Sequence, residues 1–168
     1  MADHDAAHGP ALLALHVLPI AVFALLLLLD LGDRRGLRMA GRLLSGLRHL
    51  PPALRLALLL VLVSATVHVS MVPGHLTQPV TASLFALDAT AEAALCVMAC
   101  WGFRRWRELG ATLMAVNLAA YAGYLMGGLE RPDSVGLATK LVELAALALF
   151  SLSVGESFVV GGMKVTSS

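Results

Sequence analysis

The amino-acid sequence predicts an all-α membrane protein, a polytopic bundle of five transmembrane helices. Hydrophobic residues make up 58% of the 168 residues and charged residues only 14%, whereas a soluble domain carries about 25% charged residues. Five apolar segments approach the roughly 20 residues that an α-helix needs to cross the hydrocarbon core of a bilayer. The net charge of +1 gives no electrostatic basis for binding nucleic acid. We therefore expect the chain to lie in a lipid bilayer.

Short stretches rich in proline and glycine separate the apolar segments. The expected spans are residues 11–29, 54–72, 81–103, 109–126 and 135–154. Residues 1–10 are expected to form an external tail and residues 156–168 a cytoplasmic tail, so that residues 11–155 make a single transmembrane domain. The first ten residues contain no lysine or arginine, which a cleaved signal peptide would carry, so we expect the first span to remain in the mature protein.

Basic residues predict the orientation of the spans. Cytoplasmic connections of membrane proteins carry an excess of lysine and arginine, and nine of the 12 such residues lie in or beside the first and third connections: Arg34, Arg35, Arg38, Arg42, Arg48, Arg55, Arg104, Arg105 and Arg107. The N-terminus is then outside, the C-terminus is cytoplasmic, and the connection that contains His75 faces outward. Trp101 and Trp106 flank the third connection, where aromatic side chains anchor helices at the membrane interface.

The first connection contains a basic amphipathic segment, residues 33–50. Its leucines recur at helical spacing, and arginines lie between them. This pattern is typical of a short helix that lies on an anionic inner leaflet, with its leucines among the acyl chains and its arginines among the headgroups. The alternative is a helix that packs on a partner subunit.

Each span contains a polar side chain, and these side chains fall at matching depths. At about 1.5 Å per residue, one layer lies about 6 to 11 Å below the outer surface. It contains His16, His68, Asp88, Tyr121 and Lys140. A deeper layer contains Glu92, Asn117 and Glu143. An ionisable group in a membrane costs roughly 2.5 to 3.5 kcal/mol on insertion scales, so we expect these groups to face one another inside the bundle.

Spacing supports an intramembrane polar network. Asp88 and Glu92 are four residues apart, and so are Asn117 and Tyr121, while Lys140 and Glu143 are three apart. Each pair therefore projects from one side of its helix. Such a network can simply hold helices together through hydrogen bonds. However, one lysine does not neutralise three carboxylates, so either the glutamates are protonated or a cation or proton path passes them.

Histidines near the outer surface point to a metal site. His68 and Met71 lie three residues apart, and the turn that follows brings His75 back over the helix end. Imidazole with thioether suits copper, whereas imidazole with carboxylate suits zinc, iron or manganese. The expected ligands are His68, Met71, His75 and, from the first span, His16. The favoured function is therefore metal handling or delivery, in which the outer face of the protein binds a metal cation, preferably copper.

The N-terminus offers a further ligand, His4. If the initiator methionine is removed, the chain begins Ala2-Asp3-His4, and a free amine, two backbone nitrogens and the imidazole can bind square-planar Cu(II) or Ni(II). The alternative is a loose polar tail without a ligand.

Paired histidines also suit haem. His16 and His68 are expected on adjacent helices at similar depth, so they qualify as the axial ligands of one b-type haem. The chain has no CxxCH sequence, which excludes covalently attached haem. This alternative makes the protein an accessory or assembly subunit of a respiratory or oxygenase membrane complex. A second alternative is a proton-coupled carrier that uses the midplane glutamates.

No catalytic pattern is present: GxSxG, HExxH, a Walker loop and a dinucleotide fingerprint are all missing. A stand-alone enzyme is thus the least favoured function. Cys96 and Cys100 lie inside an apolar run, where cysteines usually act as small hydrophobic residues. The expected partners are the lipid bilayer and either other subunits or further copies of the chain.

Two stretches, "VHVSMVPGHLTQPVTASLFALDATAEAAL" and "GLERPDSVGLATKLVEL", resemble uncharacterised small multi-pass membrane proteins of high-GC Gram-positive bacteria. In those proteins an outward histidine, a Pro-x-His turn and a glutamate late in a span recur. The matching residues here are His68, Pro73, His75 and Glu143. Gln78 stands where a carboxylate is expected just after the second histidine. The resemblance implies a location in a bacterial cytoplasmic membrane.

Overall fold

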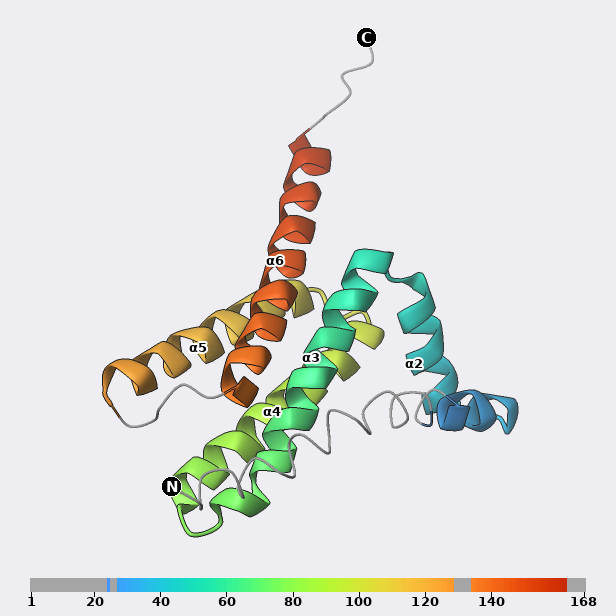
Figure 1. Cartoon of the computed structure of the whole chain (residues 1–168). Coiled ribbons are helices and arrows are strands. Elements are labelled where there is room, and N and C mark those ends of the chain that lie inside the picture. Colours follow the sequence, from blue (N-terminus) through green and yellow to red (C-terminus); the bar gives the residue numbers. More distant parts are fainter. Residues whose placement is uncertain (1–23, 25–26, 129–133, 163–168) are drawn as a thin grey trace.

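The computed structural model describes residues 24, 27–128 and 134–162, with the side chains of 153–162 excepted. Within this part of the chain the structure is helical and contains no strand. Figure 1 shows its elements, with α6 extending beyond the other helices toward the C-terminus. They are α2 (Arg38–His49), α3 (Pro52–Met71), the short 3₁₀ helix η1 (Pro73–His75), α4 (Pro79–Cys100), α5 (Trp106–Met126) and α6 (Ser134–Gly162).

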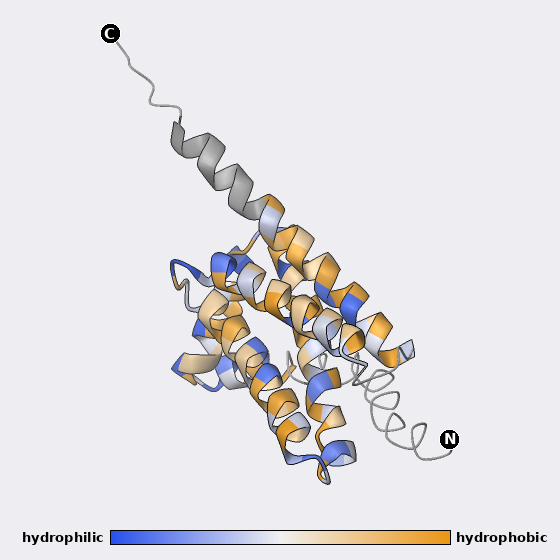
Figure 2. Ribbon diagram, turned by 90° about the vertical axis from the view of Figure 1, so that its left-hand side faces the viewer, coloured by the Kyte–Doolittle hydropathy of each residue, from blue (hydrophilic) through white to orange (hydrophobic). Residues whose placement is uncertain are grey.

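Four helical segments are long and apolar enough to cross a membrane: Pro52–His75, Pro79–Cys100, Trp106–Met126 and Ser134–Leu152. They match the second to fifth expected spans. Most of each helix is apolar, with isolated polar residues within it (Figure 2). The chain is therefore a membrane protein with at least these four candidate spans. The first expected span, residues 11–29, lies largely outside the described residues, as does the tail of residues 1–10.

The ends of α3, α4 and α5 differ from the expected ones by a few residues, whereas α6 continues to Gly162, beyond the expected end at residue 154. Proline and glycine explain the differences in α3 and α4. α3 and α4 begin at the prolines themselves, Pro52 and Pro79, because the first turn of a helix requires no N–H from proline. α4 ends at Cys100 rather than at residue 103. Gly102 adopts φ of +71°, and the N–H groups of Gly102 and Phe103 donate to the carbonyls of Ala99 and Met98 at 3.1 and 3.0 Å. This is a Schellman motif, which stops the helix.

Helix α3 is the most enclosed of the four membrane-spanning helices. It packs along both α4 and α6, and α5 packs along α6, whereas α4 and α5 meet over a much shorter length. The apolar core lies among α3, α4, α5 and α6, and it includes Leu54, Val61, Leu95, Met114 and Phe150. The four helices are thus tightly closed on three sides and more open between α4 and α5.

Two aromatic residues and a glycine shape the contact between α5 and α6. The Trp106 ring packs edge-on against Phe150 at 5.9 Å between centroids. A Cβ on Gly110 would lie 2.9 Å from the Phe150 ring, so glycine permits the close approach of these helices. Trp106 is buried, whereas Trp101 is exposed. Trp101 is thus free to act as the interfacial anchor that the sequence suggested, but Trp106 is a core residue.

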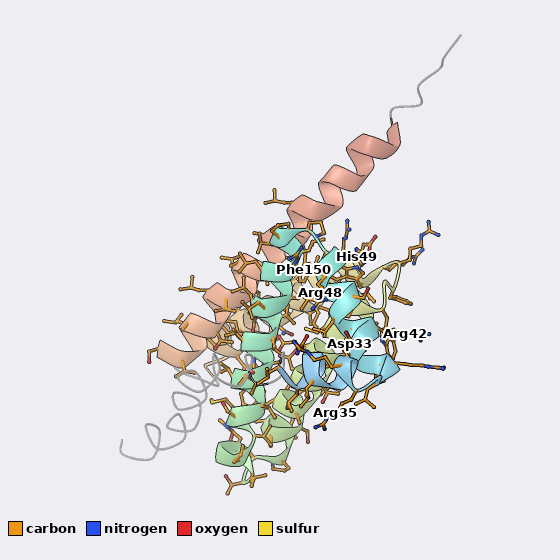
Figure 3. All side chains as sticks on the ribbon, turned by 90° about the vertical axis from the view of Figure 1, so that its right-hand side faces the viewer. Asp33, Arg35, Arg42, Arg48, His49 and Phe150 are labelled. Atoms are coloured by element: carbon orange, nitrogen blue, oxygen red, sulfur yellow. The ribbon has the colours of Figure 1, made fainter. Side chains whose placement is uncertain are left out.

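Helix α2 forms most of the basic segment of residues 33–50. A Cβ on Gly46 would collide with the carbonyl of Cys100 at the end of α4, and Leu47 packs against the apolar core. Arg35, Arg42 and Arg48 are exposed (Figure 3). α2 therefore joins the bundle through Gly46 and Leu47, and the arginines of the segment are exposed.

Candidate functional site

His68 lies on the last turn of α3 and is buried. Its Nδ1 atom is 3.0 Å from Oδ2 of Asp88 and 3.4 Å from Oε2 of Glu92, both on α4. Its Nε2 atom is 3.6 Å from Oε1 of Glu143 on α6. The imidazole therefore lies between carboxylates on two different helices.

The two α4 carboxylates reach His68 because they share a helix face. Asp88 and Glu92 are four residues apart, which places them one above the other on an α-helix. Glu92 is completely buried, and the Asp88 side chain is 20% exposed. Asp88 thus stands at the edge of the site and Glu92 in its interior.

Asn117 on α5 ties the carboxylates together. Its Nδ2 amide donates to both oxygens of Asp88, at 2.9 and 3.0 Å, and lies 3.4 Å from Oε1 of Glu92. Hydrogen bonds to a charged acceptor are worth more than neutral ones. Asn117 therefore fixes the orientation of the carboxylate that faces His68.

On α6, Lys140 and Glu143 form a close ion pair. The Lys140 Nζ atom lies 2.6 and 2.7 Å from the two oxygens of Glu143. The Ser64 hydroxyl of α3 donates to the same carboxylate at 3.1 Å. Lys140 also lies over the ring of Tyr121, 5.5 Å from its centroid. The lysine is therefore paired with Glu143, whereas within the described part of the chain Asp88 and Glu92 form their ion pairs with His68.

The structure thus gathers the whole expected polar network: Asp88, Glu92, Asn117, Tyr121, Lys140 and Glu143. The sequence reasoning divided these groups into an outer and a deeper layer, but the contacts join the layers into one network centred on His68. Ser64 was missed. Its position four residues before His68 on α3 was the signal that could have revealed it, because that spacing puts both side chains on one face.

One group of residues within the described part of the chain has the ligand atoms and the spacing that a metal ion would need. His68, Asp88 and Glu92 each offer one ligand atom, and these atoms lie within 4.8 Å of one another. One imidazole and two carboxylates form a donor set that suits zinc, iron or manganese. Three ligands from two tightly packed helices leave further coordination positions for water or for a fourth ligand.

The other expected ligands lie elsewhere. Met71 is buried in a small apolar cluster with Val67 and Val135. The His75 Nδ1 atom is 2.9 Å from the Met71 carbonyl oxygen, and Phe85 contacts both imidazoles, stacking on His68 at 5.8 Å and meeting His75 edge-on at 5.1 Å. His75 is therefore separate from the group that surrounds His68.

Two expected ligands, His4 and His16, lie outside the described residues. The haem hypothesis pairs His16 with His68, so it stays a prediction, and so does the role as an accessory subunit. Cys96 and Cys100 are free thiols. The Cys96 Sγ atom lies 3.8 Å from the Leu58 carbonyl oxygen on α3, which fits the expected role as a packing residue.

A cavity of about 540 Å³ adjoins the network among α3, α4, α5 and α6. Most of its lining is apolar, and its polar wall is formed by His68, Asp88, Asn117 and Lys140. No pattern in the sequence predicts this cavity. Its volume falls in the range of about 300 to 1,000 Å³ that is typical of small-molecule sites.

The chain was compared with protein-family models, with curated proteins and with solved structures, and no match was found in any of the three.

Proposed function

We propose that this protein is a five-span protein of a bacterial cytoplasmic membrane that binds a divalent metal cation at His68, Asp88 and Glu92. The observation that carries the proposal is the convergence of three buried or partly buried ligand atoms within 4.8 Å. With the N-terminus outside, this site lies in the outward half of the bundle. Its role is then the handling or delivery of a metal at the outer face.

Charge balance supports a cation at this position. Lys140 is paired with Glu143 at 2.6 Å, and among the described residues Asp88 and Glu92 both form their ion pairs with His68. A buried charge without compensation is strongly unfavourable. A divalent cation bound by both carboxylates, with His68 neutral, would balance their charge.

The donor set favours zinc, manganese or iron(II) over copper. The preference for copper rested on the thioether of Met71 and on His75 beside His68. Met71 packs among apolar side chains instead, and His75 contacts a backbone carbonyl. Imidazole and carboxylates are the ligands that remain, and they suit borderline and harder cations.

The His68 ring has one nitrogen for the metal and one for orientation. Nδ1 faces Asp88 and Glu92, so it is the ligating atom, and Nε2 faces Glu143 at ion-pair distance. In metal sites a carboxylate behind a histidine fixes its tautomer and its ring orientation. We assign that positioning role to Glu143, which Lys140 and Ser64 hold in place.

Metal analysis tests this proposal directly. The full chain, purified without a histidine tag and washed with chelator, is dialysed against zinc, manganese, iron(II) and copper in turn, and bound metal is measured. We expect one ion per chain, with a preference for zinc, manganese or iron(II). His68→Gln and Glu92→Gln should each weaken binding at least 100-fold, because even the outer-shell partners of metal ligands are worth roughly 10- to 100-fold in affinity.

Two control variants make the result specific. His75→Gln should bind metal like the unmodified chain, because His75 is not part of the ligand group. His4→Ala removes any copper bound by the tail. Equal binding in the His68→Gln variant, or no metal in the washed and reloaded protein, would show that this site holds no metal.

A second candidate function, a proton-coupled carrier, is favoured by the bridging position of His68. Its two ring nitrogens face carboxylates on α4 and on α6, and a histidine in this position can pass a proton between them. Liposomes separate the two functions. Proton flux without added metal that is lost in Glu143→Gln supports the carrier, and stoichiometric metal without proton flux supports the metal site.

A further inference from the structure

The cavity of about 540 Å³ is far larger than a metal ion needs. It lies beside the short contact between α4 and α5, and apolar side chains of both helices line it. Leu84, Leu87 and Val116 are three of these, and all are exposed. Exposed apolar side chains on membrane-spanning helices contact lipid. A ligand of this cavity therefore arrives from the bilayer and carries an apolar body.

The donors of Asn117, Lys140 and Thr139 in the polar wall are engaged, whereas the Asp88 carboxylate keeps spare hydrogen-bond acceptors. Asn117 donates to Asp88, Lys140 donates to Glu143, and Thr139 donates to the Val135 carbonyl. A carboxylate offers about four lone-pair sites, and the Asp88 side chain keeps 20% of its surface exposed. The wall thus has capacity for a ligand that donates hydrogen bonds.

The polar network behind this wall also carries an excess of negative charge. Three carboxylates, Asp88 in the wall and Glu92 and Glu143 behind it, face Lys140 and His68. With the three carboxylates ionised and His68 protonated, three negative and two positive charges leave one net negative charge. In a medium of low polarity this excess strongly favours a positively charged ligand.

Aromatic side chains complete the environment that suits such a ligand. Phe85, Tyr121 and Tyr124 all line the cavity. Aromatic faces attract organic cations by about 0.5 to 2 kcal/mol each, the higher values applying where water is excluded. They also pack against flat or alkyl ligand bodies.

We propose that this cavity binds a lipophilic organic amine, whose ammonium group donates to Asp88 and whose apolar body lies between α4 and α5. A neutral hydrogen-bond acceptor such as a quinone and a hydrocarbon tail both fit less well, because each leaves the negative charge of Asp88 uncompensated. The inference does not depend on the metal site, although the two ligands compete for Asp88.

A fluorescent amine tests the proposal. Dansylcadaverine, a lipophilic primary amine, is titrated against the full chain in nanodiscs, with empty nanodiscs as the background. Its hydroxyl analogue, in which a hydroxyl replaces the terminal amine, is the matched neutral probe. We expect saturable binding of the amine and only background binding of the analogue. Asp88→Asn should weaken the amine roughly 10- to 100-fold, the equivalent of one charge-assisted hydrogen bond.

A pair of steric variants tests the location without changing the network. Ala120 lines the cavity and Ala119 does not, and both are exposed on α5. Ala120→Phe should abolish amine binding, whereas Ala119→Phe should leave it unchanged. This pair decides the result if Asp88→Asn does not fold.

The outcomes separate this inference from the metal proposal. Equal binding of the amine and its hydroxyl analogue, unchanged binding in Asp88→Asn, or equal effects of the two steric variants would overturn the amine site. Metal binding is measured on the same preparations. Amine binding without metal overturns the metal proposal alone, metal without amine overturns the amine site alone, and mutual competition supports both.

Discussion

At the scale of single residues, the site is an arrangement of charges in which each group depends on its neighbours. Lys140 shows this dependence best, because it provides the ammonium that balances the completely buried Glu143. Ser64 adds one hydrogen bond to the same carboxylate. Removing the lysine therefore leaves Glu143 with the Ser64 hydroxyl and with the His68 imidazole, whose Nε2 atom is 3.6 Å away, in place of the ammonium.

We expect Lys140→Met to destabilise the protein by roughly 3 to 5 kcal/mol, the usual cost of leaving one member of a buried ion pair alone. The double variant Lys140→Met with Glu143→Leu should recover most of that loss, because no unpaired charge remains. The measurement is thermal unfolding in detergent, followed by circular dichroism.

A matched control comes from the exposed ion pair between Arg34 and Asp30, which are 2.8 Å apart with the Arg34 side chain 76% exposed. Arg34→Met should cost no more than about 1 kcal/mol. If the Lys140 and Arg34 variants unfold at the same temperature, the buried pair contributes no more than a surface pair.

Residue spacing predicted correctly which side chains share a face of one helix. Four-residue spacing placed Asp88 with Glu92 on one face, and both contact His68. The prediction of which polar side chains contact one another was less successful, because each depth in the membrane was calculated as if the helices were straight and parallel. The helices cross and α3 continues into η1, so the contacts cut across the expected layers. No spacing in the sequence indicated that Asn117 on α5 would donate to Asp88 on α4.

At the scale of the helices, the close contact between α2 and α4 depends on Gly46. A side chain at this position would meet the carbonyl of Cys100. We expect Gly46→Leu to displace α2 from the bundle, at a cost of about 1 to 3 kcal/mol, the usual range for overpacking. Faster tryptic cleavage at Arg42 and Arg48 is the readout.

Ser45→Leu is the control for this prediction, because Ser45 is exposed on the same helix. It adds the same apolar side chain without a collision. Similar cleavage rates in the Gly46 and Ser45 variants would show that α2 is not held by this contact.

The elements were predictable from sequence to a large extent. Hydrophobic runs identified four helices within a few residues, and proline and glycine set their ends. The errors have local causes: α3 and α4 begin at prolines that were taken as breaks, and α4 stops at the Schellman motif of Gly102. Leucine spacing also indicated the basic helix. The contact of Gly46 with the end of α4 could not be inferred, because it depends on tertiary packing.

At the scale of the whole molecule, the orientation in the membrane is the most consequential untested prediction. With Cys96 and Cys100 replaced by alanine, single cysteines at positions 2, 78 and 104 report on the N-terminus, the second connection and the third connection. A membrane-impermeant maleimide should label positions 2 and 78 in intact cells, and position 104 only after permeabilisation. This pattern follows from five spans and the positive-inside rule.

Other labelling patterns would contradict either the predicted number of spans or the predicted orientation. Labelling of position 78 but not position 2 in intact cells would mean that the chain has four spans with both ends inside. Labelling of position 104 alone would mean that the orientation is reversed.

Composition was enough to predict a helical membrane protein, but it did not predict the cavity. The cavity exists because α4 and α5 meet over a short length while α3 and α6 hold them together. That divergence depends on crossing angles and on the volumes of many side chains. Neither hydrophobic periodicity nor the count of polar residues in each span contains this information.

The shared network has a consequence for biogenesis. Each of α3, α4, α5 and α6 contributes a polar side chain whose partner lies on another helix. A helix released singly into lipid would carry His68 or Asp88 without that partner, at a cost of a few kcal/mol for a charged group. We therefore expect the insertion machinery to retain the early helices until the last one has been synthesised, and then to release all four together.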